Sequence, residues 1–192
     1  MQQTAKYLPA LGLHFLTPLY DPLVKWFMPE RKIKLSLVQQ AQITTKDHLL
    51  DVGCGTGTLA ILIKQAQPAA EVVGLDPDPD ILAIARKKAN TAGHQIVFNQ
   101  GFASSLPYPD HSFDRLLSSF VFHHLAVEDR RRALSEALRV LRHNGTFCLA
   151  DFAKPNKSLP SMFSEAGFVE VQTFAHYRTL FGGVSLWQGR SP

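Results

Sequence analysis

Residues 49–60 read LLDVGCGTGTLA, and this stretch decides the fold. A short apolar run ends in an acid, Asp51, and three glycines follow at alternating positions, Gly53, Gly55 and Gly57. Glycine adopts positive φ without strain and lets a ligand approach the bare backbone. The pattern therefore predicts a sharp turn from a buried strand into a helix, at a place where a ligand binds. A tight turn that binds nothing is the alternative.

The composition predicts a single domain. The chain has 192 residues, 45% of them hydrophobic, which is enough for one substantial core and short for two. Its 20 basic and 16 acidic residues give a net charge of +4, so we expect no nucleic-acid partner. Neither a signal peptide nor an apolar window near the ~20 residues of a membrane span is evident, so we expect a cytoplasmic protein. Two cysteines without a CxxC pattern argue against a disulfide framework or a structural metal.

Apolar runs alternate with helix-like patterns along most of the chain. Strands are expected at residues 48–52, 71–75, 95–100, 113–119 and 146–152. Helices are expected at residues 59–67, 78–93 and 127–145. The last helix is predicted to end at a left-handed Asn144-Gly145 pair. Most of the strands are apolar on both faces, which is typical of parallel strands covered on both sides. The order predicts an α/β fold with a doubly wound, mostly parallel sheet.

The two ends of the chain depart from this alternation. Near the C-terminus, a short helix at 161–168 precedes strand patterns at 168–177 and 182–190, which are close enough to form an antiparallel hairpin. Near the N-terminus, residues 1–44 mix bulky apolar side chains with prolines, which favours short helices folded over a ligand. We therefore expect one domain, residues 1–192, with a helical lid at 1–44 and an α/β core at 45–192.

The spacing of the glycines and one later acid favour a nucleoside. The loop reads GxGxG and not the GxGxxG of dinucleotide-binding turns, and no P-loop lysine follows it. Asp76 ends the next predicted strand, where a carboxylate accepts hydrogen bonds from both ribose hydroxyls of a nucleoside. Capping of the next helix is the alternative role for Asp76, and the two roles are compatible.

Several segments together carry a resemblance to a known family. LLDVGCGTG, VVGLD, LPYPDHSFDRLLSSFVFHHL and EALRVLRHNGTFCLADF, in this order, resemble S-adenosylmethionine-dependent methyltransferases with a seven-stranded Rossmann-like fold. The similarity is greatest to the group related to ubiquinone and menaquinone biosynthesis methyltransferases, and it runs from about residue 45 to the C-terminus. It implies S-adenosylmethionine as the cofactor, S-adenosylhomocysteine as its product and a small-molecule methyl acceptor.

The resemblance implies a site for the methionyl and ribose parts of the cofactor. Asp51 is expected near the methionine amino group, and Asp76 on the ribose. The backbone of the loop is expected near the carboxylate and the ribose; it comprises Gly53, Cys54, Gly55 and Gly57.

For the adenine and the sulfonium, the resemblance is less complete. Pro77 is expected on the adenine face, but Phe102 stands where relatives have an acid that binds the adenine amino group. Adenine recognition is then left to the Ala103 backbone and apolar packing. Ser119 is expected to face the methionyl part, and Tyr20 to lie near the sulfonium, where cation–π attraction would stabilise it.

The chemistry needs few catalytic groups. Alignment of the acceptor with the methyl group contributes on the order of 7–11 kcal/mol, and a base is required only if the acceptor arrives protonated. The candidate bases are His123, His124 and Asp151, which follow the fourth and fifth strands. For each of them, a structural role in packing, capping or bracing a loop is the alternative. The connection KPNKSLPS is too short for a substrate wall, so we expect the pocket to be completed by the lid, a second copy or a partner.

Three alternatives remain open from the residues alone. One is a noncatalytic S-adenosylmethionine-binding partner or regulator, which Phe102 and the short connection support. Another is a dehydrogenase, which only the alternating fold supports. The third concerns residues 19–34, whose apolar cluster and following basic residues suit either core packing, which we favour, or contact with a membrane surface.

Overall fold

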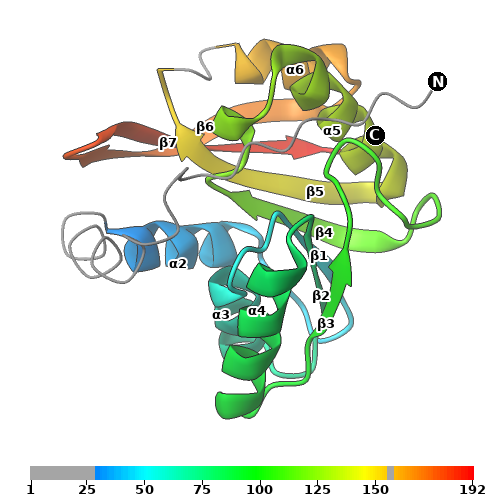
Figure 1. Cartoon of the computed structure of the whole chain (residues 1–192). Coiled ribbons are helices and arrows are strands. Elements are labelled where there is room, and N and C mark those ends of the chain that lie inside the picture. Colours follow the sequence, from blue (N-terminus) through cyan, green and yellow to red (C-terminus); the bar gives the residue numbers. More distant parts are fainter. Residues whose placement is uncertain (1–28, 155–157) are drawn as a thin grey trace, which may run out of the picture.

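The seven strands form one sheet, in the order β3-β2-β1-β4-β5-β7-β6. The computed structural model describes residues 29–154 and 158–192 (Figure 1). The strands are β1 (His48–Val52), β2 (Glu71–Asp76), β3 (Val97–Gln100), β4 (Phe113–Ser119), β5 (Leu141–Phe152), β6 (Val169–Thr179) and β7 (Gly182–Arg190). Strands β1 to β5 pair in parallel, whereas β7 lies antiparallel between β5 and β6. The predicted fold, with its C-terminal hairpin, is confirmed.

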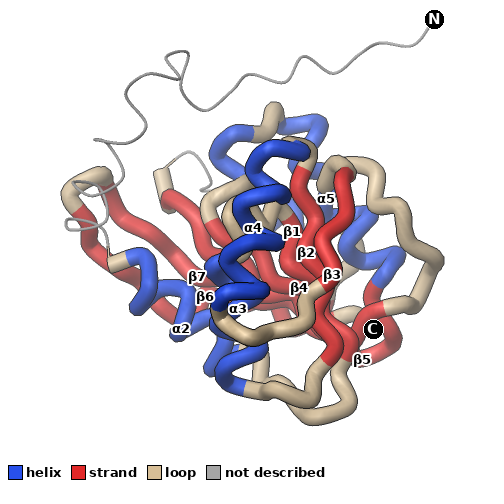
Figure 2. The backbone as a smooth tube through the Cα atoms, turned by 60° about the horizontal axis from the view of Figure 1, so that its bottom comes forward, coloured by secondary structure: helices blue, strands red, loops and turns tan. Residues whose placement is uncertain are grey.

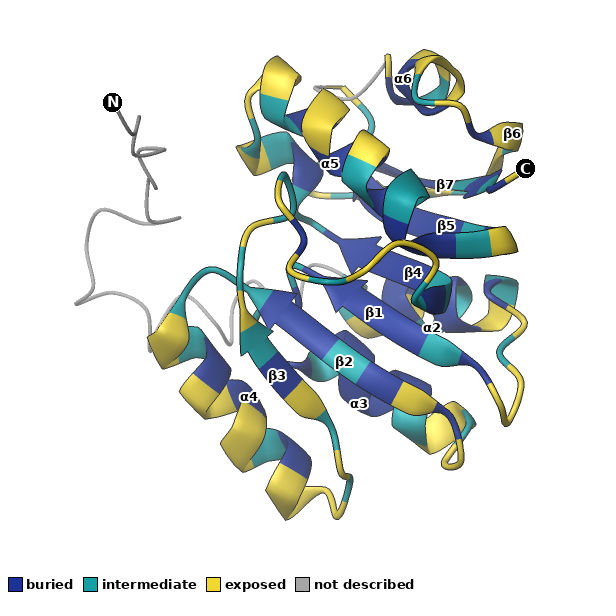
Figure 3. Ribbon diagram, turned by 90° about the vertical axis from the view of Figure 1, so that its right-hand side faces the viewer, coloured by how far each residue is buried: buried dark blue, intermediate teal, exposed yellow. Residues whose placement is uncertain are grey.

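Helices cover both faces of this sheet. They are α2 (Glu30–Gln40), α3 (Thr58–Ala66), α4 (Pro79–Thr91), α5 (Val127–Val140) and α6 (Leu159–Glu165), with a short 3-10 helix η1 (Phe122–His124). Leu49 of β1 lies in a buried cluster with α2, α3 and α4, while the next residue, Leu50, lies in a second cluster with α5 and α6. Figures 2 and 3 show these two layers on opposite sides of the strands. The alternation along β1 therefore supplies both halves of the core.

Helix α2 runs across the sheet from its carboxyl edge to its amino edge. Near the start of α2, the Lys32 ammonium lies 5.9 Å from the ring centre of Tyr177 in β6. Tyr177 pairs with Val184 of β7, which in turn pairs with Phe152, the last residue of β5, so the start of α2 lies level with the carboxyl end of β5. After its end, the Ala41 carbonyl accepts a hydrogen bond of 3.0 Å from Arg115, in the first half of β4. Residues 30–40 of the expected lid segment thus pack on the sheet. The lid prediction for residues 1–28, which includes Tyr20, lies outside the described residues.

The prediction that a helix extends to Gly145 is wrong. Helix α5 ends at Val140, and Asn144, with φ of 62°, lies within β5. Leu141 is fully buried and pairs with Phe113, so sheet pairing replaces the last helical turn. A Cβ at Gly145 would lie 3.0 Å from the Asp114 carbonyl, next to a register shift in β4. The Asn-Gly pair therefore marks an irregular strand crossing and not a helix end.

The turn between β1 and α3 contains three glycines with left-handed backbones, and their surroundings differ. A Cβ at Gly53 would lie 2.3 Å from Val121 Cγ2, and one at Gly57 would lie 3.0 Å from the Phe98 ring. At Gly55, no atom of the described chain would come within 4 Å of a Cβ. Close packing against the protein thus requires Gly53 and Gly57, whereas Gly55 presents bare backbone to open space.

Replacing Gly53 with Ala is expected to destabilise the fold more than replacing Gly93 with Ala. Both glycines have positive φ, 68° and 72°, so alanine strains each backbone by about 1–2 kcal/mol. At Gly53 the new Cβ also strikes Val121, which adds about 1–3 kcal/mol. Urea unfolding of both variants measures the difference. Equal losses would contradict the steric account, and a second change, Val121→Ala, is expected to recover part of the Gly53→Ala loss.

Candidate functional site

Asp51 is a buried acid at the carboxyl end of β1. It is fully buried, and its Oδ2 accepts a hydrogen bond of 3.1 Å from the Ala60 backbone N–H at the start of α3. Its Oδ1 has no hydrogen-bond partner among the described residues. Burial raises the pKa of this carboxyl to about 7, although the positive charge of Lys34 opposes the shift. A buried oxygen of this kind is costly without a partner, so it fits a cationic or hydrogen-bonding ligand.

Asp76 ties the glycine turn to the end of β2. Its Oδ2 accepts the Gly55 backbone N–H at 2.9 Å, and its Oδ1 accepts the Asp78 N–H at 3.1 Å. The residue that caps α4 is Asp78, whose side chain accepts from the Asp80 and Ile81 N–H groups. Asp76 therefore does not cap the helix. It is half-buried, and burial raises the pKa of its carboxyl. Each oxygen keeps a further lone pair for a ligand.

The residues expected around adenine follow the adjacent strand end. The Gly101 N–H donates to the Asp76 carbonyl at 3.2 Å, which places the next residues, Phe102 and Ala103, beside this edge. Phe102 is 49% exposed, so its ring is available for contact with a flat ligand. Pro77 is half-buried on the same edge, where its carbonyl accepts from Gln100 at 2.9 Å.

Two other expected residues differ in what they offer a ligand. Ser119 is 9% exposed at the end of β4, beside Ala150 of β5. The Cys54 side chain is buried in the core cluster, and its sulfur would lie 2.9 Å from a Cβ at Gly74. Burial, together with Asp51 and Asp76, raises the pKa of its thiol far above the usual range. The backbone of Cys54, and not its sulfur, is therefore the part that serves the loop.

The structure brings His123 and Asp151 together. Asp151 is fully buried at the end of β5, and its Oδ1 lies 2.6 Å from His123 Nδ1. Its Oδ2 accepts the His123 backbone N–H at 3.1 Å. Because the carboxylate oxygen accepts, Nδ1 donates the proton, and Nε2 of the neutral ring is left as an acceptor. The pair therefore has the arrangement of a base held in one orientation by an acid.

His124 lies differently. Its ring centre is 3.8 Å from that of His123, and the Asp151 contact belongs to His123. Burial and the neighbouring His123 lower the pKa of the His124 imidazole. Of the two candidate histidines, His123 alone lines the pocket described next.

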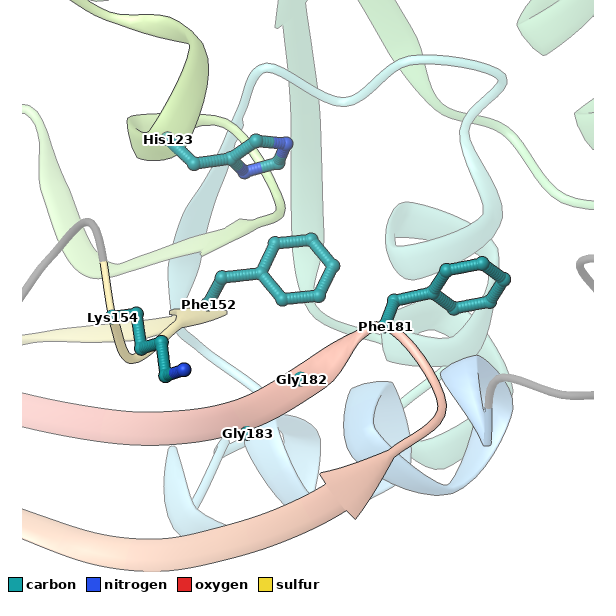
Figure 4. Close-up of a pocket in the computed structure, with 6 residues that line it drawn as sticks. All are labelled: His123, Phe152, Lys154, Phe181, Gly182 and Gly183. Carbon is teal, nitrogen blue, oxygen red and sulfur yellow. The ribbon is translucent and has the colours of Figure 1, made fainter.

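An open pocket of about 240 Å³ adjoins the His123 ring. It is lined by His123, Phe152, Lys154, Phe181, Gly182 and Gly183 (Figure 4). The ring of Phe152 stands edge-on to that of His123, with centres 5.1 Å apart. Phe181 comes from the tip of the β6–β7 hairpin and is 50% exposed. The pocket is thus bordered by two phenylalanine rings, the His123 imidazole, the Lys154 ammonium and two glycines.

Comparison with known proteins decides the family. Residues 49–145, just over half of the chain, match the family model described as a methyltransferase domain. A demethylmenaquinone methyltransferase of Thermus thermophilus is 35% identical over 161 residues, which are 83% of this chain and 72% of that protein. The chain belongs to the methyltransferase-domain family. It is an S-adenosylmethionine-dependent methyltransferase.

Further relatives agree with this assignment. A demethylmenaquinone methyltransferase of Deinococcus radiodurans is 36% identical over 146 residues. These residues are 75% of this chain and 60% of the Deinococcus protein. The crystal structure of a putative methyltransferase from Bacillus halodurans superimposes with a TM-score of 0.72 at 22% identity, covering 83% of this chain and 98% of that one. The latter likeness shows the shared fold.

Sequence reasoning missed part of the methyltransferase's site. Phe152, Lys154 and Phe181 line the pocket, and Lys34 lies near Asp51, but none of them was expected. The Glu30–Lys34 spacing within an apolar segment was the one available signal for a buried ion pair. In residues 29–154 and 158–192, no three His, Cys, Asp or Glu side chains gather to hold a metal ion. No helix of these residues is long and apolar enough to cross a membrane.

Substitution of Asp51 by Asn is expected to change how stability depends on pH. The folded-state pKa of about 7 lies above the unfolded value of about 3.9, so the folded protein holds an extra proton between them. As pH rises through this window, wild-type stability is expected to fall relative to Asp51→Asn by up to about 1.4 kcal/mol per pH unit, and to level off above it. Urea unfolding across the window measures the difference. A constant difference would contradict a protonated Asp51 in the cofactor-free fold.

Proposed function

We propose that the enzyme methylates a hydroxylated aromatic acceptor, with the His123–Asp151 pair as the base. The observation that carries this proposal is the pair itself, whose histidine lines a pocket that two phenylalanine rings also border. Aromatic rings bind flat ligands through apolar contact and offset or edge-to-face stacking. A hydroxyl on such a ligand would donate a hydrogen bond to His123 Nε2 and transfer its proton to that nitrogen.

The proposed cofactor site follows the carboxyl edge from β1 to β3. The unpartnered Asp51 Oδ1 suits the amino group of the methionyl part, and the bare backbone at Gly55 allows close approach. Asp76 would accept the ribose hydroxyls with the lone pairs that its two backbone hydrogen bonds leave free. Adenine would lie between Pro77 and the Phe102–Ala103 segment. Gly53, Cys54, Gly57 and Ser119 complete the site, mostly as backbone and packing.

The chain's own residues account for the remaining requirements of the reaction. When bound, S-adenosylmethionine would supply a sulfonium-bound methyl group, which an electron-rich atom attacks with S-adenosylhomocysteine as the leaving group. His123 Nε2 takes the acceptor's hydroxyl proton, and the buried Asp151 carboxylate stabilises the resulting imidazolium. Lys154, on the pocket border, favours the oxyanion that remains. The electron-rich ring then attacks the methyl group through its oxygen or through a ring carbon next to it; after attack through carbon, the hydrogen on that carbon leaves as a proton and the ring becomes aromatic again.

The names of the relatives support an acceptor of this class. The Thermus and Deinococcus proteins are demethylmenaquinone methyltransferases, and the reduced form of a demethylmenaquinone is a hydroxylated aromatic ring. A short-chain demethylmenaquinol is therefore the first acceptor to test. Methyl transfer to any hydroxylated aromatic ring separates the enzyme from a noncatalytic binding protein, because only the enzyme yields methylated product.

We also propose a cytoplasmic location, which the two free, buried thiols of Cys54 and Cys148 support. Membrane contact by residues 19–34 stays the less favoured alternative to core packing, and a homodimer, in which a second copy would complete the pocket, stays a possibility from the sequence.

Replacing Asp76 with Asn is expected to weaken S-adenosylmethionine binding about 10- to 100-fold, the value of charged hydrogen bonds worth about 1.5–3 kcal/mol. The neutral amide removes the charge that ribose hydroxyls would meet. Isothermal titration calorimetry measures the change. Asp80→Asn, an exposed acid one turn away, is the matched control and is expected to bind as the wild type does. Unchanged affinity in Asp76→Asn would contradict the ribose assignment.

Replacing His123 with Gln is expected to lower turnover of the quinol about 10²- to 10⁴-fold and to leave S-adenosylhomocysteine affinity unchanged. At higher pH the acceptor ionises without help, so part of the lost rate is expected to return. His124→Gln is the control and should keep turnover within about threefold, because His124 does not line the pocket. Steady-state assays across pH measure both variants. Wild-type turnover in His123→Gln would exclude it as the base.

A further inference from the structure

Lys34 is a buried cation on α2, and among the described residues its ion-pair partner is Glu30 of the same helix. The residue is 8% exposed, and its Nζ lies 2.6 Å from Glu30 Oε1. An ammonium group has three N–H donors, and removing it from water is costly unless they are used. Glu30, one turn earlier and more exposed, accounts for one of these donors among the described side chains. Lys34 therefore has capacity for a further anion.

The direction of α2 places Lys34 at the carboxyl edge of the sheet. The start of α2 lies by Tyr177, level with the end of β5, and the residue after its end contacts Arg115, near the start of β4. Lys34 lies in the first half of the helix, on the side of Asp51 and the glycine turn. Its charge opposes the rise that burial causes in the pKa of both Asp51 and Cys54, which agrees with this position.

A buried acid and a buried base thus lie close to the same turn. Asp51 presents an oxygen with no partner among the described residues, and Lys34 presents an ammonium with spare donors. The amino-acid end of S-adenosylmethionine is a zwitterion, with one ammonium and one carboxylate. A site that holds one acid and one base matches both charges without leaving net charge buried.

We propose that Lys34 binds the carboxylate of the cofactor's methionyl part while Asp51 binds its ammonium. This inference rests on the proposed placement of the cofactor. Lys34 lies outside residues 49–145, the stretch that matches the methyltransferase family model. Helix α2 is thereby part of the cofactor site, and different elements bind the two halves of the cofactor. Adenosine contacts the ends of β2 and β3, whereas the amino-acid end contacts β1 and α2.

A purely structural role makes a different prediction. If Lys34 only neutralises Asp51, its removal disturbs the turn and weakens every ligand that lies across the turn. If Lys34 binds the carboxylate, its removal weakens only ligands that carry that group. Three ligands separate these cases: S-adenosylmethionine, its decarboxylated analogue, which lacks only the carboxylate, and 5′-methylthioadenosine, which lacks the whole amino-acid end.

The experiment is calorimetric titration of the full chain with these three ligands, in the wild type and in Lys34→Met. The wild type is expected to bind S-adenosylmethionine about 10- to 100-fold more tightly than the decarboxylated analogue. In Lys34→Met this preference is expected to shrink to about threefold or less, with methylthioadenosine affinity unchanged. Lys32→Met, on the same helix but exposed, is the matched control and is expected to keep the wild-type preference.

Several results would overturn the inference. Equal affinity of the wild type for the two sulfonium ligands would do so without any variant, even if Lys34→Met fails to fold. A preference that survives in Lys34→Met, or an equal loss for all three ligands, would do so as well. If methylthioadenosine binds but S-adenosylmethionine and its decarboxylated analogue bind with equal affinity, the Lys34 inference fails and the proposed cofactor site stands. If the wild type binds none of the three, the proposed cofactor site itself fails.

Discussion

The turn from β1 into α3 is the constraint on which the rest of the structure depends. The central strand of a parallel sheet must reverse into a covering helix within a few residues, and here three left-handed glycines make this turn. The turn is then held at two points by carboxylates, with Asp51 accepting the Ala60 N–H and Asp76 accepting the Gly55 N–H. The same acids that stabilise the backbone are the ones proposed to bind the cofactor.

This arrangement divides the work along one edge of the sheet. The ends of β1, β2 and β3 provide acids and bare backbone, which suit the cofactor. The ends of β4 and β5 provide His123 and Asp151, and the hairpin tip adds Phe181, which suit an aromatic acceptor. Because parallel strands end at the same edge, donor and acceptor are expected to meet there without long loops. The short connection after β5 is compatible with this plan, since the hairpin supplies part of the pocket border.

Much of the fold was predictable because its signals are local. Strand and helix periodicity located β1, β4 and β7 at their observed bounds, and the short separation of β6 and β7 predicted their hairpin. The Asn144-Gly145 pair misled because the same residues suit a helix end and an irregular strand. What selected the strand was the pairing of Leu141 with Phe113, a contact between distant segments that no local pattern shows.

The candidate site was predictable only residue by residue. His123 and Asp151 were each expected, but their contact depends on the register of β4 against β5. The approach of Phe181 depends on the hairpin, and that of Lys34 on the path of α2. Motifs that lie on a single loop can be predicted from the sequence, whereas the contacts of a site assembled from several elements can be predicted only from the tertiary structure.

We infer that burial keeps a proton on a large share of the Asp51 carboxyls until the cofactor's ammonium arrives. With a pKa of about 7, about half of the Asp51 carboxyls carry a proton at pH 7. Calorimetry of S-adenosylhomocysteine binding at pH 7, in two buffers of different ionisation enthalpy, counts the protons that binding releases. Binding is expected to release about half a proton in the wild type and none in Asp51→Asn. Tight binding with no proton release by the wild type would contradict it.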